Sequence, residues 1–318
     1  MYLKVLKEEN YEEVMKTTVE PYLNAHRETG YFERVKGEPI YYEHYREGSP
    51  KGVIVISHGF TESIKKFSEV IYYMLQAGYE VWGVDHRGHG RSIRLNDNPH
   101  VVHAEVFEDY VLDLVYFTDN IIKPAAGELP IYLYCHSMGG CIGAWILSKY
   151  PNLFDKAVLS SPMLGLTFGK IPVPVVYALA SIIGIGERRK NPFGSDGTFN
   201  TEPDFENSAS SSRTRYDYYF KKSLEDPYIQ ICAPSIQWGK EAAKACKYVV
   251  SHADRVKIPV MLFQAGADTI VKNSAENTFA ERAKNCELVN IPAVKHELYM
   301  TDSEVLEPYI NKVIEFLG

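Results

Sequence analysis

Short runs of apolar residues, many of them β-branched, recur along the chain with helical stretches between them. Each run is apolar at consecutive positions, which is typical of strands buried on both faces of a parallel sheet. The runs are Val53–Ile56, Val81–Val84, Ile131–Tyr134, Ala157–Leu159, Val260–Phe263 and Leu288–Val289. From Val106 to Ile121, apolar residues recur at steps of three and four, as on the buried face of a helix. This alternation predicts a doubly wound α/β fold, with a mostly parallel central sheet flanked by helices.

The spacing of the strands predicts an insertion. Three intervals between strand starts are 26 to 28 residues, which fits one strand and one helix, but the starts at 157 and 260 are 103 residues apart. A structureless loop of that length is improbable in a compact domain. We therefore expect an inserted helical cap at residues 163–250, on a core formed by residues 1–162 and 251–318. Near the N-terminus, Tyr31–Val35 and Ile40–Tyr45 predict an antiparallel pair of edge strands.

Composition excludes several classes of protein. The 318 residues are 45% hydrophobic and 24% charged, which is ordinary for a globular chain and excludes intrinsic disorder. There are 34 Lys and Arg against 41 Asp and Glu, a net charge of −7 with no long basic run, so nucleic acid is not an expected partner. The five cysteines are odd in number and form no CxxC pair, which argues against a disulfide scaffold or a zinc ribbon and favours a reducing compartment.

The sequence also indicates how the protein could relate to a membrane. Residues 1–9 carry Lys and Glu and do not resemble a signal peptide. The longest apolar run, Ile171–Gly186, is shorter than the roughly 20 residues that cross a bilayer. We expect a cytoplasmic protein whose cap could touch the inner face of the membrane, through this run and the basic triplet Arg188–Lys190 that follows it. The sequence does not determine the oligomeric state.

A candidate nucleophile lies directly after the strand that begins at Ile131. The turn reads Cys135-His136-Ser137-Met138-Gly139 and precedes a helical pattern. A serine on such a sharp strand-to-helix turn has its hydroxyl exposed above the sheet, and small residues two positions to either side let the turn close. Gly139 meets this requirement, while Cys135 replaces the usual first glycine with another small residue. We expect Ser137 to be the nucleophile.

A serine nucleophile needs a base and an acid that orients the base. Asp268 follows the strand Val260–Phe263, and His296 follows the strand around Leu288. Both therefore lie at carboxyl ends of strands, the edge at which α/β sheets place their sites. The chain order of serine, acid and histidine is the order expected for this kind of fold. We expect Ser137, Asp268 and His296 to form a catalytic triad.

The oxyanion hole requires two backbone N–H donors. One should come from Met138, the residue after the nucleophile, and the other from Phe60, in the loop after an early strand. His58 is interpreted as a residue that braces this loop. The segment Asp85–Ser92 contains two histidines but no further ligand spacing, so we interpret it as a tight loop beside the site and expect neither a metal nor a cofactor.

Taken together, these residues resemble a known family. His58-Gly59-Phe60, the segment Asp85–Ser92, His136–Gly140, Asp268 and His296 are similar to the motifs of the α/β-hydrolase fold, and more narrowly of its bacterial lysophospholipase and monoacylglycerol lipase branch. The stretch Ser212–Tyr216, with Asp226-Pro227 and Trp238, is similar to the lid of bacterial lysophospholipases. The resemblance implies hydrolysis of the acyl ester of a small monoacyl lipid through an acyl-serine intermediate.

The cap should set specificity. Tyr216 and Trp238 are candidate substrate-binding residues, or fill the small core of the cap. Two alternatives remain open. A serine aminopeptidase on the same fold would need acidic cap residues for an α-ammonium group, and Glu202, Asp204 and Glu206 lie close together in sequence. A member without enzymatic activity would use the pocket to bind a lipid or a signal, although the intact set of triad residues argues against it.

Overall fold

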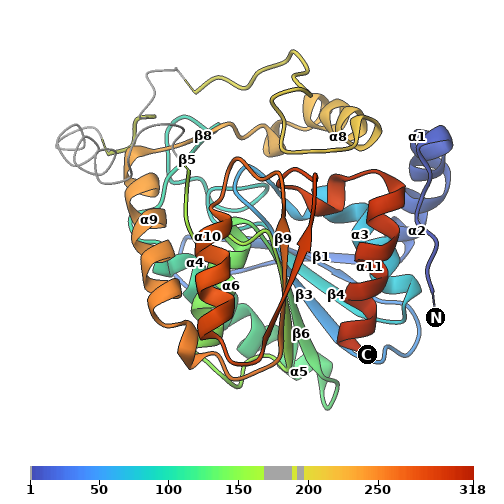
Figure 1. Cartoon of the computed structure of the whole chain (residues 1–318). Helices are drawn as coiled ribbons and strands as arrows, with labels where there is room; N and C mark the ends of the chain where they lie inside the picture. The colour runs from blue at the N-terminus through green and yellow to red at the C-terminus, as the bar shows by residue number, and fades with distance from the viewer. Residues whose placement is uncertain (1, 168–187, 192–196) are drawn as a thin grey trace.

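The computed structural model describes residues 2–167, 188–191 and 197–318 (Figure 1). Its central sheet has eight strands in the order β1-β2-β4-β3-β6-β7-β9-β10. The pairs β1–β2 and β2–β4 are antiparallel, and all other neighbours are parallel, which confirms the predicted fold class. The strands are β1 (Arg27–Phe32), β2 (Ile40–Tyr45), β3 (Val53–Ser57), β4 (Glu80–Val84), β6 (Ile131–His136), β7 (Lys156–Ser160), β9 (Val260–Ala265) and β10 (Cys286–Ile291).

The N-terminal pair is antiparallel as predicted and β2 has the predicted bounds, but the first strand is displaced from the predicted range Tyr31–Val35. β1 begins at Arg27 and ends at Phe32, where Phe32 pairs with Ile40. Residues 33–39 then form the connection, with Gly37 at a φ of 82°, a conformation that glycine adopts without strain. Of these two strands, only β1 is at an edge of the sheet, since β2 pairs with β4 on its other side.

Helices cover both faces of the sheet, and each face has its own apolar core. α4, α6, α9 and α10 contribute to one core, and the N-terminal helices, α3 and α11 to the other. The helices are α1 (Tyr11–Val14), α2 (Glu20–Ala25), α3 (Ser68–Gln76), α4 (Glu108–Phe117), α5 (Lys123–Ala126), α6 (Met138–Lys149), α8 (Arg213–Glu225), α9 (Ile236–Ser251), α10 (Asn273–Arg282) and α11 (Ser303–Leu317). Two π-helical segments, η2 (Met15–Val19) and η4 (Thr118–Ile122), join α1 to α2 and α4 to α5.

Short 3₁₀ turns complete the described elements. They are η1 (Glu8–Asn10), η3 (Ile64–Phe67), η5 (Pro227–Ile229), η6 (Ala253–Arg255) and η7 (Leu298–Met300). A two-residue parallel ladder joins β5 (Val101–Val102) to β8 (Ala233–Pro234). Because β8 belongs to the long segment between β7 and β9, this ladder ties that segment to the loop that follows β4.

The described part of residues 163–250 has two components. α8 lies over one end of the sheet, whereas α9 packs along α6 and shares its core (Figure 1). The apolar run Ile171–Gly186 falls outside the described residues. The division into a core and a cap with boundaries at 162/163 and 250/251 stays a prediction. Within the described residues, no helix combines the length and apolar character needed to span a membrane.

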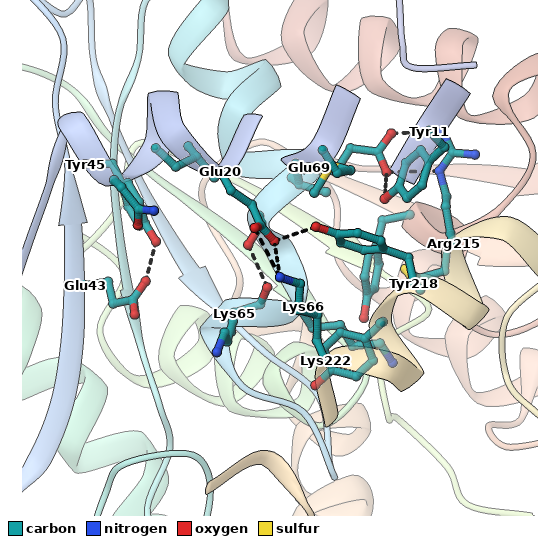
Figure 2. A pocket seen from close by; sticks show the side chains of 18 of the residues that line it. Tyr11, Glu20, Glu43, Tyr45, Lys65, Lys66, Glu69, Arg215, Tyr218 and Lys222 are labelled. Carbon is teal, nitrogen blue, oxygen red and sulfur yellow. Dashed lines mark hydrogen bonds and ion pairs between the residues drawn. The ribbon is translucent and has the colours of Figure 1, made fainter. Parts of the chain in front are cut away.

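An N-terminal arm, defined here as residues 2–25, holds α8 against the core. The guanidinium of Arg215 on α8 donates to both carboxylate oxygens of Glu69 on α3, at 3.0 and 2.9 Å, and to Glu8 of the arm at 2.5 Å. The Tyr218 hydroxyl donates to Glu20 of the arm, as Figure 2 shows. A cavity of about 280 Å³ remains between the arm, α3 and α8. α8 is therefore fixed by buried charge pairs on the side that faces the arm.

Candidate functional site

The turn between β6 and α6 presents Ser137 above the sheet. Ser137 has a φ of 51° and a ψ of −115°, which is a strained conformation for a residue with a side chain. Its backbone is fixed on both sides, because its N–H donates to the carbonyl of Ser160 at 3.1 Å and its own carbonyl accepts from the N–H of Met163 at 2.8 Å. A Cβ at Gly139 would lie 2.0 Å from the carbonyl oxygen of Ser57, so this position requires glycine.

The same geometry explains Cys135. Its side chain is fully buried and faces Gly143, which lies on α6 one helical turn after Gly139. A Cβ at position 143 would lie 2.6 Å from the Cys135 sulfur. In the usual motif, a glycine at the position of Cys135 leaves the space that the turn needs. Here Gly143 on the helix leaves that space instead. The turn closes with a cysteine because position 143 has no side chain.

The structure brings the three predicted triad side chains into one line. The Nε2 of His296 lies 2.8 Å from the Oγ of Ser137, and its Nδ1 lies 2.6 Å from Oδ2 of Asp268. The His296 side chain is 5% exposed and that of Asp268 is fully buried. An imidazole that donates from Nδ1 to a carboxylate keeps a lone pair on Nε2, in position to accept the serine proton.

Asp268 is held as a carboxylate. Its Oδ1 accepts from the backbone N–H groups of Ile270 and Val271, at 2.8 and 3.0 Å. Burial favours the neutral acid, but the hydrogen bond and charge of His296, together with these N–H groups, outweigh it and lower the pKa of Asp268. The acid can therefore orient the histidine and stabilise its protonated form.

The two candidate oxyanion donors follow neighbouring strands of the sheet. Met138 is the first residue of α6, where backbone N–H groups lack acceptors within the helix. Phe60 lies three residues after the end of β3, and β3 and β6 are neighbours in the sheet. The Nδ1 of His58 lies 2.7 Å from the carbonyl oxygen of Gly59, and its Nε2 accepts from the N–H of His86 at 2.9 Å. These contacts are those of a histidine that braces the loop.

Trp238 contacts the candidate oxyanion loop, whereas Tyr216 lines a cavity beside the site. The ring of Trp238, on α9, packs 4.2 Å from the ring of Phe60, and its Nε1 donates to the hydroxyl of Tyr110 at 3.1 Å. Tyr216, on α8, lines a cavity of about 160 Å³ together with Thr61 and Glu297, the residues next to Phe60 and His296. α8 therefore covers a space that adjoins the site.

The residues considered for other functions have structural contacts. Asp85 accepts from the N–H groups of Ile64 and Arg91, at 2.9 and 2.8 Å, and so ties two loops together. No group of three potential metal-ligating side chains occurs among the residues that the structure describes. Of the acidic residues proposed for an α-ammonium group, Asp204 accepts from the side-chain amide of Asn207 at 3.0 Å in a local turn. Those acidic residues are all exposed.

A group of charged residues beside the triad was not predicted from the sequence. Glu62, Lys66 and Glu297 have side chains that are 3%, 10% and 12% exposed, and they lie between the candidate oxyanion loop and His296. In the sequence they look like surface residues, since Lys and Glu are rarely buried unless paired. The one available signal is the position of Glu62, three residues after Gly59, where a carboxylate can reach back to a backbone N–H.

The fold, the strained serine turn and the aligned Ser–His–Asp side chains define a serine hydrolase of the α/β-hydrolase class. Solved structures agree on the fold. A soluble variant of the Saccharomyces cerevisiae monoglyceride lipase superposes with a TM-score of 0.73 at 19% identity, covering 91% of this chain and 94% of that one. The Paleococcus ferrophilus monoacylglycerol lipase superposes with a TM-score of 0.66 at 24% identity, covering 87% and 98%.

Sequence comparison identifies the family. The pattern of the family described as "Serine aminopeptidase, S33" matches residues 48–304, and the chain belongs to this family. Lysophospholipase L2 of Escherichia coli (strain K12) is 30% identical over 256 residues, which are 80% of this chain and 75% of that protein. The human monoglyceride lipase is 25% identical over 244 residues, covering 75% of this chain and 72% of that protein.

Proposed function

We propose that this hydrolase cleaves the ester of a small monoacyl lipid, a lysophospholipid or a monoacylglycerol, with Ser137, His296 and Asp268 as its catalytic triad. The observation that carries the proposal is the alignment of Ser137 Oγ, His296 and Asp268 at distances of 2.8 and 2.6 Å. The substrate class is supported by the relatives described as lysophospholipase L2 and monoglyceride lipase.

In the first half of the reaction, Ser137 Oγ attacks the ester carbonyl carbon while its proton passes to Nε2 of His296. The carbonyl oxygen gains the negative charge and is stabilised by the N–H groups of Phe60 and Met138. When the tetrahedral intermediate collapses, the bond to the leaving alcohol breaks, and protonated His296 returns the proton to that alcohol. The products of this half are the free alcohol and an acyl-serine.

In the second half, water replaces the alcohol. His296 takes a proton from water as the water oxygen attacks the acyl carbon, and the same two N–H groups hold the oxyanion. The bond between the acyl carbon and Ser137 Oγ then breaks, and His296 returns the proton to the serine. The fatty acid leaves, and no cofactor is consumed. Throughout, Asp268 remains ionised and holds the imidazole in one orientation.

Two aromatic residues complete the proposed site. Tyr216 lines the cavity that adjoins Thr61 and Glu297, and we assign it to the substrate side of α8. Trp238 acts through Phe60, whose ring it packs against, and so supports the oxyanion loop. We propose a cytoplasmic enzyme that reaches its substrate from the aqueous side, with peripheral membrane contact through the residues 163–250.

The family description also names a peptidase activity, which gives a second candidate. An aminopeptidase must pair a substrate α-ammonium group with a carboxylate. The acidic residues at 202, 204 and 206 are exposed and line neither cavity described above. We therefore prefer the esterase.

The test compares Ser137→Ala with Ser148→Ala. Ser148 also lies on α6, but its hydroxyl donates to the carbonyl of Trp145, away from the triad. On lysophosphatidylcholine, monoacylglycerols, short p-nitrophenyl esters and aminoacyl-naphthylamides, Ser137→Ala should lower kcat by several orders of magnitude, whereas Ser148→Ala should leave it nearly unchanged. Near-normal ester turnover by Ser137→Ala would overturn the proposed triad. Faster turnover of the naphthylamides than of all esters would favour the peptidase.

A further inference from the structure

Beside the triad, a buried lysine lies between two buried carboxylates. The Nζ of Lys66, in η3, is 2.5 Å from Oε1 of Glu297 and 3.4 Å from Oε1 of Glu62. All three side chains are almost completely enclosed. Moving a charged group out of water costs free energy, so buried charges need to be paired. The pairing then fixes the positions of the segments that carry them.

Glu62 contacts the segments that make up the site. Its Oε2 accepts from the backbone N–H of Gly59 at 2.6 Å, directly before Phe60, and its Oε1 accepts from the Tyr299 hydroxyl at 2.5 Å. The Nε2 of His136, the residue before the nucleophile, lies 3.6 Å from the same oxygen. Between Gly59 and Glu62 the chain makes a tight turn, with Thr61 at a φ of 61°. The carboxylate of Glu62 thus holds a strained turn closed.

Lys66 joins this turn to the loop that carries the histidine. Glu297 follows His296 in the chain, and its backbone N–H donates to the carbonyl of Ala209 at 3.0 Å. The path Gly59–Glu62–Lys66–Glu297 therefore links the Phe60 turn to the His296 loop through side chains alone. The ammonium group also lies 5.1 Å from the ring centroid of Tyr219 on α8.

Both partners of the central pair are charged. Burial would raise the pKa of Glu62, but the charge that His136 acquires once it is protonated at acid pH, the charge of Lys66 and the hydrogen bond from Tyr299 outweigh it and lower the pKa to about 2. Burial would lower the pKa of Lys66, but Glu297 and Glu62 raise it above its usual value. Burial also lowers the pKa of His136 to about 3, so this imidazole is neutral near pH 7. Lys66 is therefore the cation that compensates both carboxylates.

We propose that Glu62 and Lys66 are positioning residues for the hydrolysis: Glu62 holds the turn that aims the Phe60 N–H at the developing oxyanion, and Lys66 fixes the spacing between that turn and the His296 loop. This inference rests on the proposed triad and oxyanion donors. The aim of the Phe60 N–H matters only once charge has moved to the carbonyl oxygen. Loosening the turn should therefore lower kcat and leave KM nearly unchanged.

The experiment measures kcat and KM on a p-nitrophenyl ester series for Glu62→Ala, Lys66→Met, Tyr299→Phe and their matched control, Lys65→Met. Lys65 is the neighbouring lysine, but its side chain is 38% exposed and pairs with Asp226 instead. Rates are normalised to the fraction of sites that a fluorophosphonate labels at saturation. Removing a single oxyanion donor costs about 10²–10³ in kcat, and a loosened donor should cost less, roughly 10-fold to 100-fold for Glu62→Ala and Lys66→Met.

Tyr299→Phe removes a single hydroxyl and keeps the ring, so it provides a variant that should fold. We expect it to lower kcat about 3-fold to 10-fold, which is less than the loss expected when an oxyanion donor is removed outright. Lys65→Met should match the unmodified protein. The Glu62→Ala/Lys66→Met double variant should lose about as much as the worse single variant, because both act through one path.

Normal kcat per labelled site in Tyr299→Phe and Lys66→Met, a loss confined to KM, or losses that multiply in the double variant would each overturn this inference. Ser137→Ala, assayed in parallel, separates the two proposals. If Ser137→Ala is inactive while Lys66→Met is normal, the triad stands and the positioning role is wrong. If Ser137→Ala is active, the proposed function itself has failed.

Discussion

The packing of Gly143 against Cys135 can be tested by adding one methyl group. A Cβ at position 143 would lie 2.6 Å from the sulfur of Cys135 and 3.1 Å from Cδ2 of Leu133. Non-bonded heavy atoms normally settle about 3.5–4 Å apart, so Gly143→Ala forces a shift of about 1 Å in a close-packed region. Overpacking of this kind costs about 1–3 kcal/mol, while alanine gains about 1 kcal/mol over glycine inside a helix.

The clash and the helix gain are separated by two comparisons. Gly239 lies inside α9, where an added Cβ would meet no neighbouring atom within 4 Å, so Gly239→Ala should only gain, by up to about 1 kcal/mol. Cys135→Gly removes the sulfur, and in that background Gly143→Ala should become favourable. In a double-mutant cycle, the double variant should therefore be more stable, by about 1–3 kcal/mol, than the sum of the two single effects on the free energy of unfolding predicts.

Urea unfolding of the four variants of the cycle, with comparable slopes, measures this coupling. Ester turnover provides a second readout, since α6 carries Ser137 and Met138 at its start. A shift of about 1 Å in its second turn should lower kcat roughly 10-fold in Gly143→Ala, and the double variant should recover most of it. Additive effects, within about 0.5 kcal/mol, would show that Gly143 does not make room for Cys135 and refute the explanation of this turn.

Three further predictions concern buried groups. Arg215→Met leaves Glu69 buried without its guanidinium partner and should destabilise the chain by about 3–5 kcal/mol in urea unfolding. Lys221→Met breaks only the exposed pair with Glu12 and should leave the stability nearly unchanged. Gly139→Ala drives a Cβ into the carbonyl of Ser57 and should abolish turnover or folding, whereas Gly239→Ala, where an added Cβ meets no neighbouring atom within 4 Å, should be tolerated. A carboxylate whose pKa folding lowers stabilises the native state above its ordinary pKa and loses that contribution as pH falls through the folded value. The contribution of Glu62 should therefore be complete above about pH 4.5 and disappear as the pH falls toward 2, and the acid-induced loss of stability should be smaller in Glu62→Gln than in the unmodified protein.

The sequence was sufficient for the sheet and for the placement of the triad residues. Five of the six predicted apolar runs lie in strands that the sheet buries on both faces, and such runs are visible without tertiary information. The sixth, Leu288–Val289, lies in the edge strand β10 and is partly exposed. Ser137, Asp268 and His296 each follow one of these strands at its carboxyl end, so one topological rule brings residues separated by 159 positions within hydrogen-bond distance. Their catalytic roles stay a prediction until the variants are measured.

Other features depend on contacts that a single sequence does not reveal. Charged residues such as Glu62, Lys66 and Glu297 are normally expected at the surface. Only the fold shows that these three are buried together. Gly143 explains Cys135 because the two face each other across a strand and a helix. The N-terminal arm gave no signal of its attachment to α8, since pairs such as Arg215 with Glu8 join positions 207 residues apart.

The central claim is that Ser137 is the residue that carries the acyl group, and covalent labelling tests it most directly. The folded protein is titrated with a fluorophosphonate while ester turnover and the mass of the tryptic peptides are followed in the same samples. We predict that activity falls in proportion to a single adduct on the peptide that contains Ser137, and that His296→Ala reacts far more slowly. Loss of activity with an unmodified Ser137 peptide, or full turnover once that serine is completely modified, would contradict the account.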